Sequence, residues 1–599
     1  MKKATLSLCI ASMLVSGWAL GQQALPDLLQ NIPNREQITL DGLWQAIVDP
    51  LENGYYNHRY QPREDGYFKN AKMQGPSDLV EYDFDTDLEL MVPGDWNTQD
   101  DKLYYYEGTV WYKRSFDFAR QEGIRTYVHF GAVNYHARVY LNGTYLGEHT
   151  GGYTPFQFEV TSLLQEKDNF LVVKVDNKRL REGVPTVNTD WWNYGGITRS
   201  VRLVLVPRRH IQDYVVRLDK EDPKTIEGWI AGVGYAENDP VTLSIPELQL
   251  TYRGQFDASG KVHFSLKGKP ALWSPENPKL YRVVIHTPED RVEDEIGFRH
   301  IATKGSQILL NGKPIFLKGI SIHEEAPFKT GRVNSAEECR VLLGWARELG
   351  CNFIRLAHYP HNEHMVREAE KMGFLIWSEI PVYWTVLYEN EATYFNAENQ
   401  LSEMIARDKN RAAVALWSIA NETPVSDARN QFLEKLARKA RELDDSRLIT
   451  AALDTHSGGP GERIIDDPLG AVVDVIGMNS YCGWYSGAPE SCPGMKWTNT
   501  YDKPMIMSEY GAGALQGYHG TAGERWTEEY QAEVYTKNIE MMRGIDFLAG
   551  ASPWILMDFR SARRHLKKIQ KDFNRKGLIS EQGHKKKAFY VLREYYQSF

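Results

Sequence analysis

Cysteine and long apolar runs are scarce in this 599-residue chain, and its acidic residues outnumber its basic ones. With 5 cysteines, it is not built on a disulfide framework. Its formal net charge is −9, and it shows no basic face of the kind that nucleic-acid binding requires. No apolar stretch reaches the roughly 20 residues that a membrane-spanning helix needs. These absences predict a soluble globular protein without nucleic-acid partners and without membrane insertion.

The N-terminus has the pattern of a secretory signal peptide. Lys2 and Lys3 precede a mostly apolar run from Leu6 to Ala19, and small residues follow up to Gly21. We therefore expect residues 1–21 to be cleaved, and the mature protein to act in the periplasm or outside the cell.

Cleavage would leave four cysteines. Cys339 lies in a predicted helix and Cys351 follows its end, so about 18 Å separates them, which is beyond disulfide reach. Cys482 and Cys492 share one loop rich in Gly, Pro and Ser and could pair in an oxidising compartment. No spacing resembles a zinc cluster, so we expect no metal and no other cofactor.

The pattern of strands and helices changes twice along the mature chain. Residues 22–206 show short alternating strands separated by turns, which predicts a β-sandwich. A second strand-rich block, residues 207–300, has the size of an immunoglobulin-like sandwich. Residues 301–599 alternate strands with amphipathic helices, which fits a (β/α)8 barrel. The expected candidate strands of the barrel are Ile315–Gly319, Phe353–Leu356, Phe374–Ser378, Val414–Ser418, Leu448–Ala452, Val473–Met478, Met505–Ser508 and Ser552–Met557.

Two glutamates follow barrel strands at the end where barrel enzymes carry out their chemistry. Glu422 follows the fourth strand and Glu509 the seventh. If they face each other across the barrel mouth, one can attack a sugar's anomeric carbon while the other protonates the departing oxygen. Repulsion and burial would keep one of them protonated near neutral pH. A single strand-end carboxylate is weak evidence, since most only end a strand, but the pair favours a catalytic role.

A series of motifs in a fixed order covers nearly the whole mature chain. They are Gly94-Asp95-Trp96, the stretch from Asp190 to Ile197, Asn311-Gly312-Lys313-Pro314, Lys318-Gly319, His323-Glu324, the stretch from Asn352 to Pro360, Ser418 to Glu422, and Ser508 to Gly511. Together they resemble glycoside hydrolase family 2, the family of β-galactosidases, β-glucuronidases and β-mannosidases. The resemblance implies a jelly-roll domain, an immunoglobulin-like domain and a barrel, in the order predicted above, and a retaining exo-β-glycosidase.

The resemblance also implies roles for individual residues. Glu422 would be the acid/base, Glu509 the nucleophile, and Asn421 a donor to the sugar 2-hydroxyl. Arg355 would orient the nucleophile and keep it ionised, although a buried ion pair without a catalytic part is the alternative.

Two histidines are also implied to line the pocket. They are His323 and His358, although an isolated histidine is more often a satisfied core residue.

Several other positions resemble the β-glucuronidases within this family. Asn479, Tyr481 and Tyr485 match a sixth-strand segment, and Trp554 an eighth-strand end. Asp190, on a jelly-roll loop, matches a residue that binds sugar hydroxyls.

The chain also resembles β-glucuronidases in an Asn-x-Lys pair after the eighth strand, which in those enzymes selects acidic sugars. Asn574 and Lys576 match the pair that binds the uronate carboxylate, and an amide and an ammonium are suitable donors for it. The alternative is that Lys576 is one of many solvated charges in this segment. Gln570 also stands where an arginine is usual, which leaves a galacturonide or a galactoside open as substrate.

The sequence predicts an enzyme that hydrolyses terminal β-glucuronides or related β-uronides. The alternatives are a β-galactosidase or β-galacturonidase of the same family, and a carbohydrate-binding protein without catalysis. Homo-oligomerisation is left open.

Overall fold

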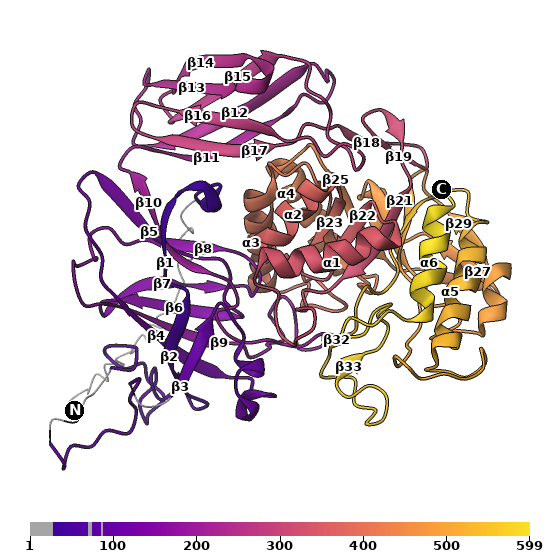
Figure 1. Ribbon diagram of the computed structural model, residues 1–599, viewed down its shortest axis with the longest axis horizontal. Helices are drawn as coiled ribbons and strands as arrows, with labels where there is room; N and C mark the ends of the chain where they lie inside the picture. The colour runs from indigo at the N-terminus through magenta and orange to yellow at the C-terminus, as the bar shows by residue number, and fades with distance from the viewer. Residues whose placement is uncertain (1–27, 70–72, 74, 86–87) are drawn as a thin grey trace, which may run out of the picture.

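A computed structural model describes residues 28–69, 73, 75–85 and 88–599 of the protein. The expected signal peptide, residues 1–21, lies outside these ranges. Three bodies of secondary structure follow one another along the chain. Figure 1 shows them as an indigo-to-purple pair of sheets, a magenta sandwich, and a barrel that runs from pink to yellow.

The first body is a sandwich of two antiparallel sheets. Its elements are η1 (Ile32–Asn34), β1 (Glu36–Thr39), β2 (Gly42–Val48), β3 (Leu88–Val92), η2 (Trp96–Thr98), η3 (Asp101–Leu103), β4 (Thr109–Phe116), β5 (Ile124–Phe130), β6 (His136–Leu141), β7 (Thr144–Thr150), β8 (Phe156–Glu159), β9 (Asn169–Asp176) and β10 (Val201–Pro207). The sheets have the orders β1-β10-β5-β8 and β3-β2-β4-β9-β6-β7. Trp44, Val128 and Leu203 belong to one buried apolar cluster shared by both sheets. Burial of that cluster holds the sheets face to face.

The second body is a smaller sandwich with its own core. Its elements are β11 (His210–Leu218), β12 (Thr225–Val233), β13 (Pro240–Ile245), η4 (Pro246–Leu248), β14 (Leu250–Gln255), β15 (Lys261–Lys267), β16 (Tyr281–His286) and β17 (Arg291–Ile296). The sheets are β11-β12-β15 and β14-β13-β16-β17. Tyr214, Ile230 and Val283 lie in the cluster between them.

The third body is a closed parallel barrel. Its strands follow the order β21 (Leu317–Ile322), β22 (Phe353–Leu356), β23 (Leu375–Glu379), β24 (Val414–Asn421), β25 (Leu448–Leu453), β28 (Val475–Asn479), β30 (Met505–Glu509) and β31 (Leu548–Ala551). All eight residues of β24 are buried, as expected for a strand covered on both faces. The predicted fold class is therefore confirmed.

Helices and short strands surround the barrel. They are β18 (Ile301–Lys304), β19 (Gln307–Leu310), β20 (Lys313–Pro314), α1 (Ala336–Leu349), α2 (Glu363–Met372), α3 (Glu391–Asp408), α4 (Asp427–Leu443), β26 (His456–Gly459), β27 (Glu462–Ile465), η5 (Pro468–Ala471), η6 (Pro489–Gly494), β29 (Lys496–Asn499), α5 (Glu528–Met542), β32 (Phe559–Arg560), β33 (Phe573–Asn574) and α6 (Lys587–Gln597). The first helix, α1, begins where the Ser335 side chain accepts from the Glu338 amide, and it ends at Gly350 with φ of 88°. Within the described ranges, no helix is long and apolar enough to cross a membrane.

The predicted eighth barrel strand, Ser552–Met557, was wrong, because the strand that closes the barrel is β31. Pro553 has no amide to donate to a ladder. The strand instead contains Gly550, where a Cβ would stand 2.7 Å from the Cβ of Leu317. Close contact between β21 and β31 thus requires a residue without a side chain. Ala and Gly have low strand propensity, so the sequence pattern did not indicate a strand at Leu548–Ala551.

The two loop cysteines, whose pairing the sequence left open, form a disulfide. Cys482 and Cys492 are bonded, whereas Cys339 and Cys351 are free. This bond closes a loop of the barrel between β28 and β29.

The first body is held against the barrel by a loop that precedes β10. The Trp192 amide donates to the Arg560 carbonyl at 3.0 Å, and the Arg560 guanidinium lies 4.0 Å from the centre of the Trp192 ring. The Tyr105 hydroxyl also donates to Asp572 Oδ2 at 2.5 Å. The loop can therefore place side chains at the barrel mouth.

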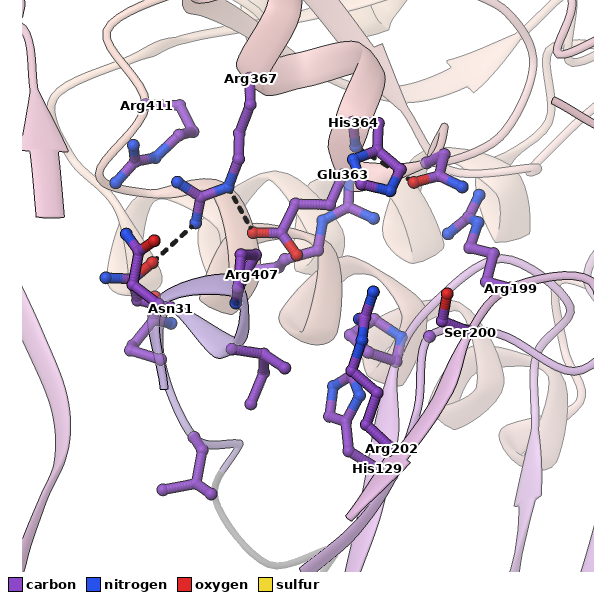
Figure 2. Close-up of a pocket in the computed structure, with 18 of the residues that line it drawn as sticks. Asn31, His129, Arg199, Ser200, Arg202, Glu363, His364, Arg367, Arg407 and Arg411 are labelled. Atoms are coloured by element: carbon purple, nitrogen blue, oxygen red, sulfur yellow. Dashed lines mark hydrogen bonds and ion pairs between the residues drawn. The ribbon is translucent and has the colours of Figure 1, made fainter. Parts of the chain in front are cut away.

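A cleft of about 280 Å³ lies where the first body meets helix α2 (Figure 2). Four of its arginines are paired with carboxylates of the protein, namely Arg199, Arg367, Arg407 and Arg411. In Figure 2 Arg367 points to Glu363 on one side and Asn31 on the other. Arg199 with Glu324 and Arg411 with Asp294 join different domains, whereas Arg367 and Arg407 pair within their own helices, so only part of the cleft is an ion-paired contact between domains.

We predict that Arg411→Ala destabilises the protein. Arg411 pairs with Asp294 of β17 and, at 3.3 Å, with Glu370 of α2, and all three side chains are buried. Its removal leaves two buried carboxylates without this cation, a loss of about 3–5 kcal/mol. Thermal unfolding followed by circular dichroism should show a lower midpoint. The matched control is Arg282→Ala, because Arg282 pairs with Glu293 at the surface and is 54% exposed. Equal midpoints for the two variants would contradict the prediction.

Candidate active site

Glu422 and Glu509 both lie at the C-terminal mouth of the barrel. Glu422 directly follows β24, and Glu509 is the last residue of β30. Tyr383 is buried at the site, with its ring centre 4.8 Å from that of His358. Burial, and then the charges of Asp190, Glu422 and Glu509, raise the pKa of this tyrosine well above the usual range.

Two neutral donors hold the Glu422 carboxylate. The Trp384 indole N–H donates to Oε2 and the Asn479 amide to Oε1, each at 2.8 Å. The backbone of Glu422 has φ of 50°, a conformation that residues with a side chain rarely adopt. These contacts orient the carboxylate without adding a charge to it.

Glu509 has a cation on one oxygen and a phenol on the other. Arg355 Nη1 donates to Oε1 at 2.7 Å, and the Tyr481 hydroxyl donates to Oε2 at 2.6 Å. Burial raises the pKa of Glu509 above its usual range and the charge of Glu422 adds to this, although Arg355 opposes both. Arg355 thus limits the effect of burial on Glu509 without reversing it.

A third glutamate, Glu379, stabilises the arginine. It is the last residue of β23 and accepts from Arg355 Nη2 at 3.2 Å. The His358 Nδ1 lies 2.7 Å from the same Oε1. Burial opposes ionisation of Glu379, but Arg355 and His358 hold its pKa at about 2. Arg355 is therefore shared between one permanently ionised carboxylate and Glu509.

The Asn421 amide is oriented with its donor free. Its Oδ1 accepts from Arg355 Nη2 at 2.6 Å and from Asn479 Nδ2 at 3.3 Å. Its Nδ2 is buried and has no hydrogen-bond partner in the described part of the chain. An amide N–H beside Glu422 is therefore available to a ligand.

Aromatic and imidazole rings form one wall of the site. The Trp554 ring stacks on that of His358 with 4.7 Å between the centres, and His323 lies 5.1 Å from Trp554. Burial, followed by the charges of its neighbours, lowers the pKa of His323 well below the usual range, so the ring is neutral. Its Nε2 has no partner among the described residues.

Asp190 belongs to the first body, and its side chain contacts the barrel loops that follow β31. It accepts from Ser561 Oγ at 2.6 Å, from Arg564 Nε at 3.0 Å and from Asn574 Nδ2 at 3.1 Å. Burial alone would raise the pKa of Asp190, but Arg564 lowers it below the usual range. The carboxylate is thus an acceptor that orders the Asn574 amide.

Lys576 is buried in the same cluster, so it is not one more solvated charge. It is 3% exposed, and its ammonium donates to the Tyr485 hydroxyl at 2.8 Å. The ammonium lies 5.4 Å from the centre of the Tyr481 ring. No carboxylate of the described residues lies within ion-pair distance of it. All the predicted site residues therefore belong to one continuous set of contacts.

Sequence reasoning missed four residues of the site. They are Glu379, Tyr383, Trp384 and Arg564. Glu379 follows the predicted third strand directly, so the strand-end rule that selected Glu422 and Glu509 could have found it. Tyr383, Trp384 and Arg564 lie in loops and carry no such signal. For the described residues, no group of three or more His, Cys, Asp or Glu side chains is arranged to hold a metal ion.

Family models match almost all of the chain. The sugar-binding domain of glycosyl hydrolases family 2 matches residues 39–207, a further domain of that family matches 209–299, and its TIM-barrel domain matches 301–599. The chain belongs to glycosyl hydrolases family 2. As a member of family 2, it is a glycoside hydrolase.

Relatives of this family 2 enzyme align with it along almost its whole length. It is 29% identical to a β-glucuronidase of Rattus norvegicus, over 94% of this chain and 91% of that protein. It is 27% identical to a β-glucuronidase of Paenibacillus borealis, over 93% and 96%. The solved structure of a β-glucuronidase from an uncultured Clostridium species is 27% identical, with a TM-score of 0.79 over 94% of this chain and 98% of that one.

We predict that Tyr481→Phe moves the acid limb of the pH profile upward. The lost hydroxyl stabilises the ionised form of Glu509, so its removal raises the pKa of Glu509 further. In the unmodified enzyme, kcat/KM should fall as the pH is lowered, with an apparent pKa above 4.5, the ordinary value for glutamate. In the variant, the fall should lie about one pH unit higher. A limb at the same pH in both would mean that a group other than Glu509 controls it.

Proposed function

We propose that this family 2 enzyme is a retaining β-glucuronidase that removes terminal β-D-glucuronic acid by double displacement. Glu509 attacks the anomeric carbon while Glu422 protonates the departing oxygen, and a covalent glycosyl-enzyme forms. Glu422 then takes a proton from water, and the water releases the sugar with its β configuration. The N-terminal pattern of residues 1–21 supports an activity in the periplasm or outside the cell.

The observation that carries the choice of sugar is the burial of Lys576. A buried ammonium without a carboxylate partner is costly, because its desolvation is not offset by an opposite charge. The hydrogen-bond partner of the ammonium, the Tyr485 hydroxyl, is neutral, and Asn574 Oδ1 accepts from the backbone amide of Lys576. A uronate carboxylate would supply the missing charge and would accept from both the ammonium and an amide. A neutral galactoside would leave Lys576 unpaired.

The charges around Asp190 favour the same substrate. Arg564 neutralises Asp190, so Lys576 remains as the net positive charge of this cluster. The three relatives compared above are named β-glucuronidases, which also favours glucuronic acid over the galacturonide and galactoside alternatives.

The contacts of Asn421 support its proposed part in the reaction. Arg355 and Asn479 occupy its oxygen, so its free N–H can donate to the sugar 2-hydroxyl. Such a contact strengthens as positive charge develops at the anomeric carbon. His323 and Trp554 would enclose the sugar ring on the other side.

We predict that Glu509→Gln abolishes turnover, because an amide cannot act as the nucleophile. Glu422→Gln should slow hydrolysis of substrates with poor leaving groups and spare the first step for an activated phenol, which departs without protonation. Rates on alkyl and nitrophenyl glucuronides would check this. Proton NMR at early times should show a β product, and an α product first would refute double displacement.

We predict that Lys576→Ala lowers kcat/KM on a nitrophenyl glucuronide at least about tenfold, following the loss of a charged hydrogen bond. The low rate on a matched galactoside should change little, because that sugar has no carboxylate. Lys567→Ala is the control, since Lys567 is an exposed lysine of the same segment.

Equal losses on the acidic and neutral substrates would show that Lys576→Ala damaged the fold. No loss on the glucuronide would refute the role of Lys576 and would favour the galactosidase alternative. A matched galacturonide, measured in the same series, distinguishes the two acidic sugars.

A further inference from the structure

A second cavity opens beside Glu422. Its volume is about 310 Å³, at the lower end of the range for small-molecule sites, which suits a single ring. None of Glu509, Asp190, Asn574 or Lys576 lines it. The residues that do are Trp384, Glu422, Pro424, Leu453, Asp454, Thr455, Met478 and Asn479.

The position of this cavity follows from the chemistry of Glu422. A general acid must lie within hydrogen-bond reach of the oxygen that it protonates, so the group on that oxygen lies next to it. We propose that the cavity is the leaving-group subsite and that it takes a neutral sugar. This inference rests on the proposed function, since it assigns the other half of the same substrate.

One wall of the cavity is suited to the apolar face of a sugar ring. Leu453 and Met478 are buried at its base, and the half-buried indole of Trp384 stands beside them. A flat aromatic ring packs well against the C–H face of a pyranose. The Trp384 indole N–H is fixed on Glu422 Oε2, so its ring is held in one orientation.

The rim of the cavity is suited to hydroxyl groups. Asp454 and Thr455 directly follow β25. Asp454 Oδ1 accepts from the Thr455 backbone amide at 2.8 Å, which fixes the carboxylate. The second carboxylate oxygen and the Thr455 hydroxyl remain able to bind hydroxyls of a ligand. An aromatic leaving group would use the indole wall but not these groups.

The charge of the cavity disfavours an acidic leaving group. Glu422 and Asp454 are both carboxylic acids, and no lysine or arginine lines the cavity. Arg563 lies 4.7 Å from the centre of the Trp384 ring, but it is not a lining residue, and it donates to Asn188 Oδ1 at 3.0 Å. Glu422 carries its proton when the substrate is bound, so a second uronate would meet the charge of Asp454 without a compensating cation, which lowers its affinity.

The test compares three substrates that share a glucuronosyl unit. They are nitrophenyl glucuronide, a disaccharide with a neutral hexose as leaving group, and a disaccharide with a uronate as leaving group. Asp454→Asn should lower kcat/KM on the neutral disaccharide about tenfold relative to the nitrophenyl glucuronide. It should raise the rate on the acidic disaccharide, because one like charge is removed.

Two further variants complete the series. Thr455→Val should lower the same ratio without raising the rate on the acidic disaccharide, because it removes a hydroxyl and no charge. Asp466→Asn is the matched control. Asp466 pairs with His456 in the chain segment that follows Thr455, and it does not line the cavity. Its three rates should stay within about twofold of the unmodified enzyme.

Unchanged ratios in both Asp454→Asn and Thr455→Val would overturn the neutral-sugar subsite, as would a preference of the unmodified enzyme for the acidic disaccharide. Failure of the proposed function would look different, because the nitrophenyl glucuronide itself would not be hydrolysed. In that case the galacturonosyl or galactosyl form of the same three substrates carries the same comparison of leaving groups.

Discussion

Arg355 lies fully buried at the mouth of the barrel and connects four of its strands through one guanidinium. It comes from β22 and contacts Glu379 at the end of β23, Asn421 at the end of β24 and Glu509 at the end of β30. A planar group with five donors can satisfy all these acceptors at once, which a lysine cannot do. The orientation of the nucleophile and of the Asn421 amide therefore depends on the same side chain.

This arrangement explains why the carboxylates of the site differ in their ionisation. Arg355 and His358 both contact Glu379 and lower its pKa, whereas burial and the nearby Glu422 raise the pKa of Glu509. Glu422 itself is held only by the neutral donors Trp384 and Asn479. Environment rather than residue type thus separates the pKa values of Glu379 and Glu509, which both end barrel strands.

The site also has opposite charge at its two ends. Lys576 and Arg564, with only Asp190 to balance them, form the end proposed to hold a uronate. Asp454 supplies the negative charge at the end proposed to hold the leaving group, beside the proton donor Glu422. A disaccharide of one acidic and one neutral sugar would match this charge distribution only with its acidic sugar at the Lys576 end. The first body contributes to that selection through Asp190, so the substrate pocket is completed by a domain distant in sequence.

Much of this protein could be predicted from local patterns in its chain. Strand periodicity indicated the sandwiches, and strands alternating with amphipathic helices indicated the barrel. Glu422 and Glu509 could be selected because each directly follows a strand, and strand ends in a parallel barrel share one mouth. The eighth strand could not, because a steric contact between Gly550 and Leu317 decides it and low-propensity residues form it.

The sequence by itself determined the fold class, the family motifs and the pair of glutamates, since each depends on residues close together in the chain. Only the tertiary structure decided the environment of each side chain. It buried Lys576 without a carboxylate partner, placed Arg564 against Asp190 and brought Trp384 onto Glu422. These contacts join residues tens to hundreds of positions apart. Packing of loops and domains sets them, and no local pattern in the sequence records that packing.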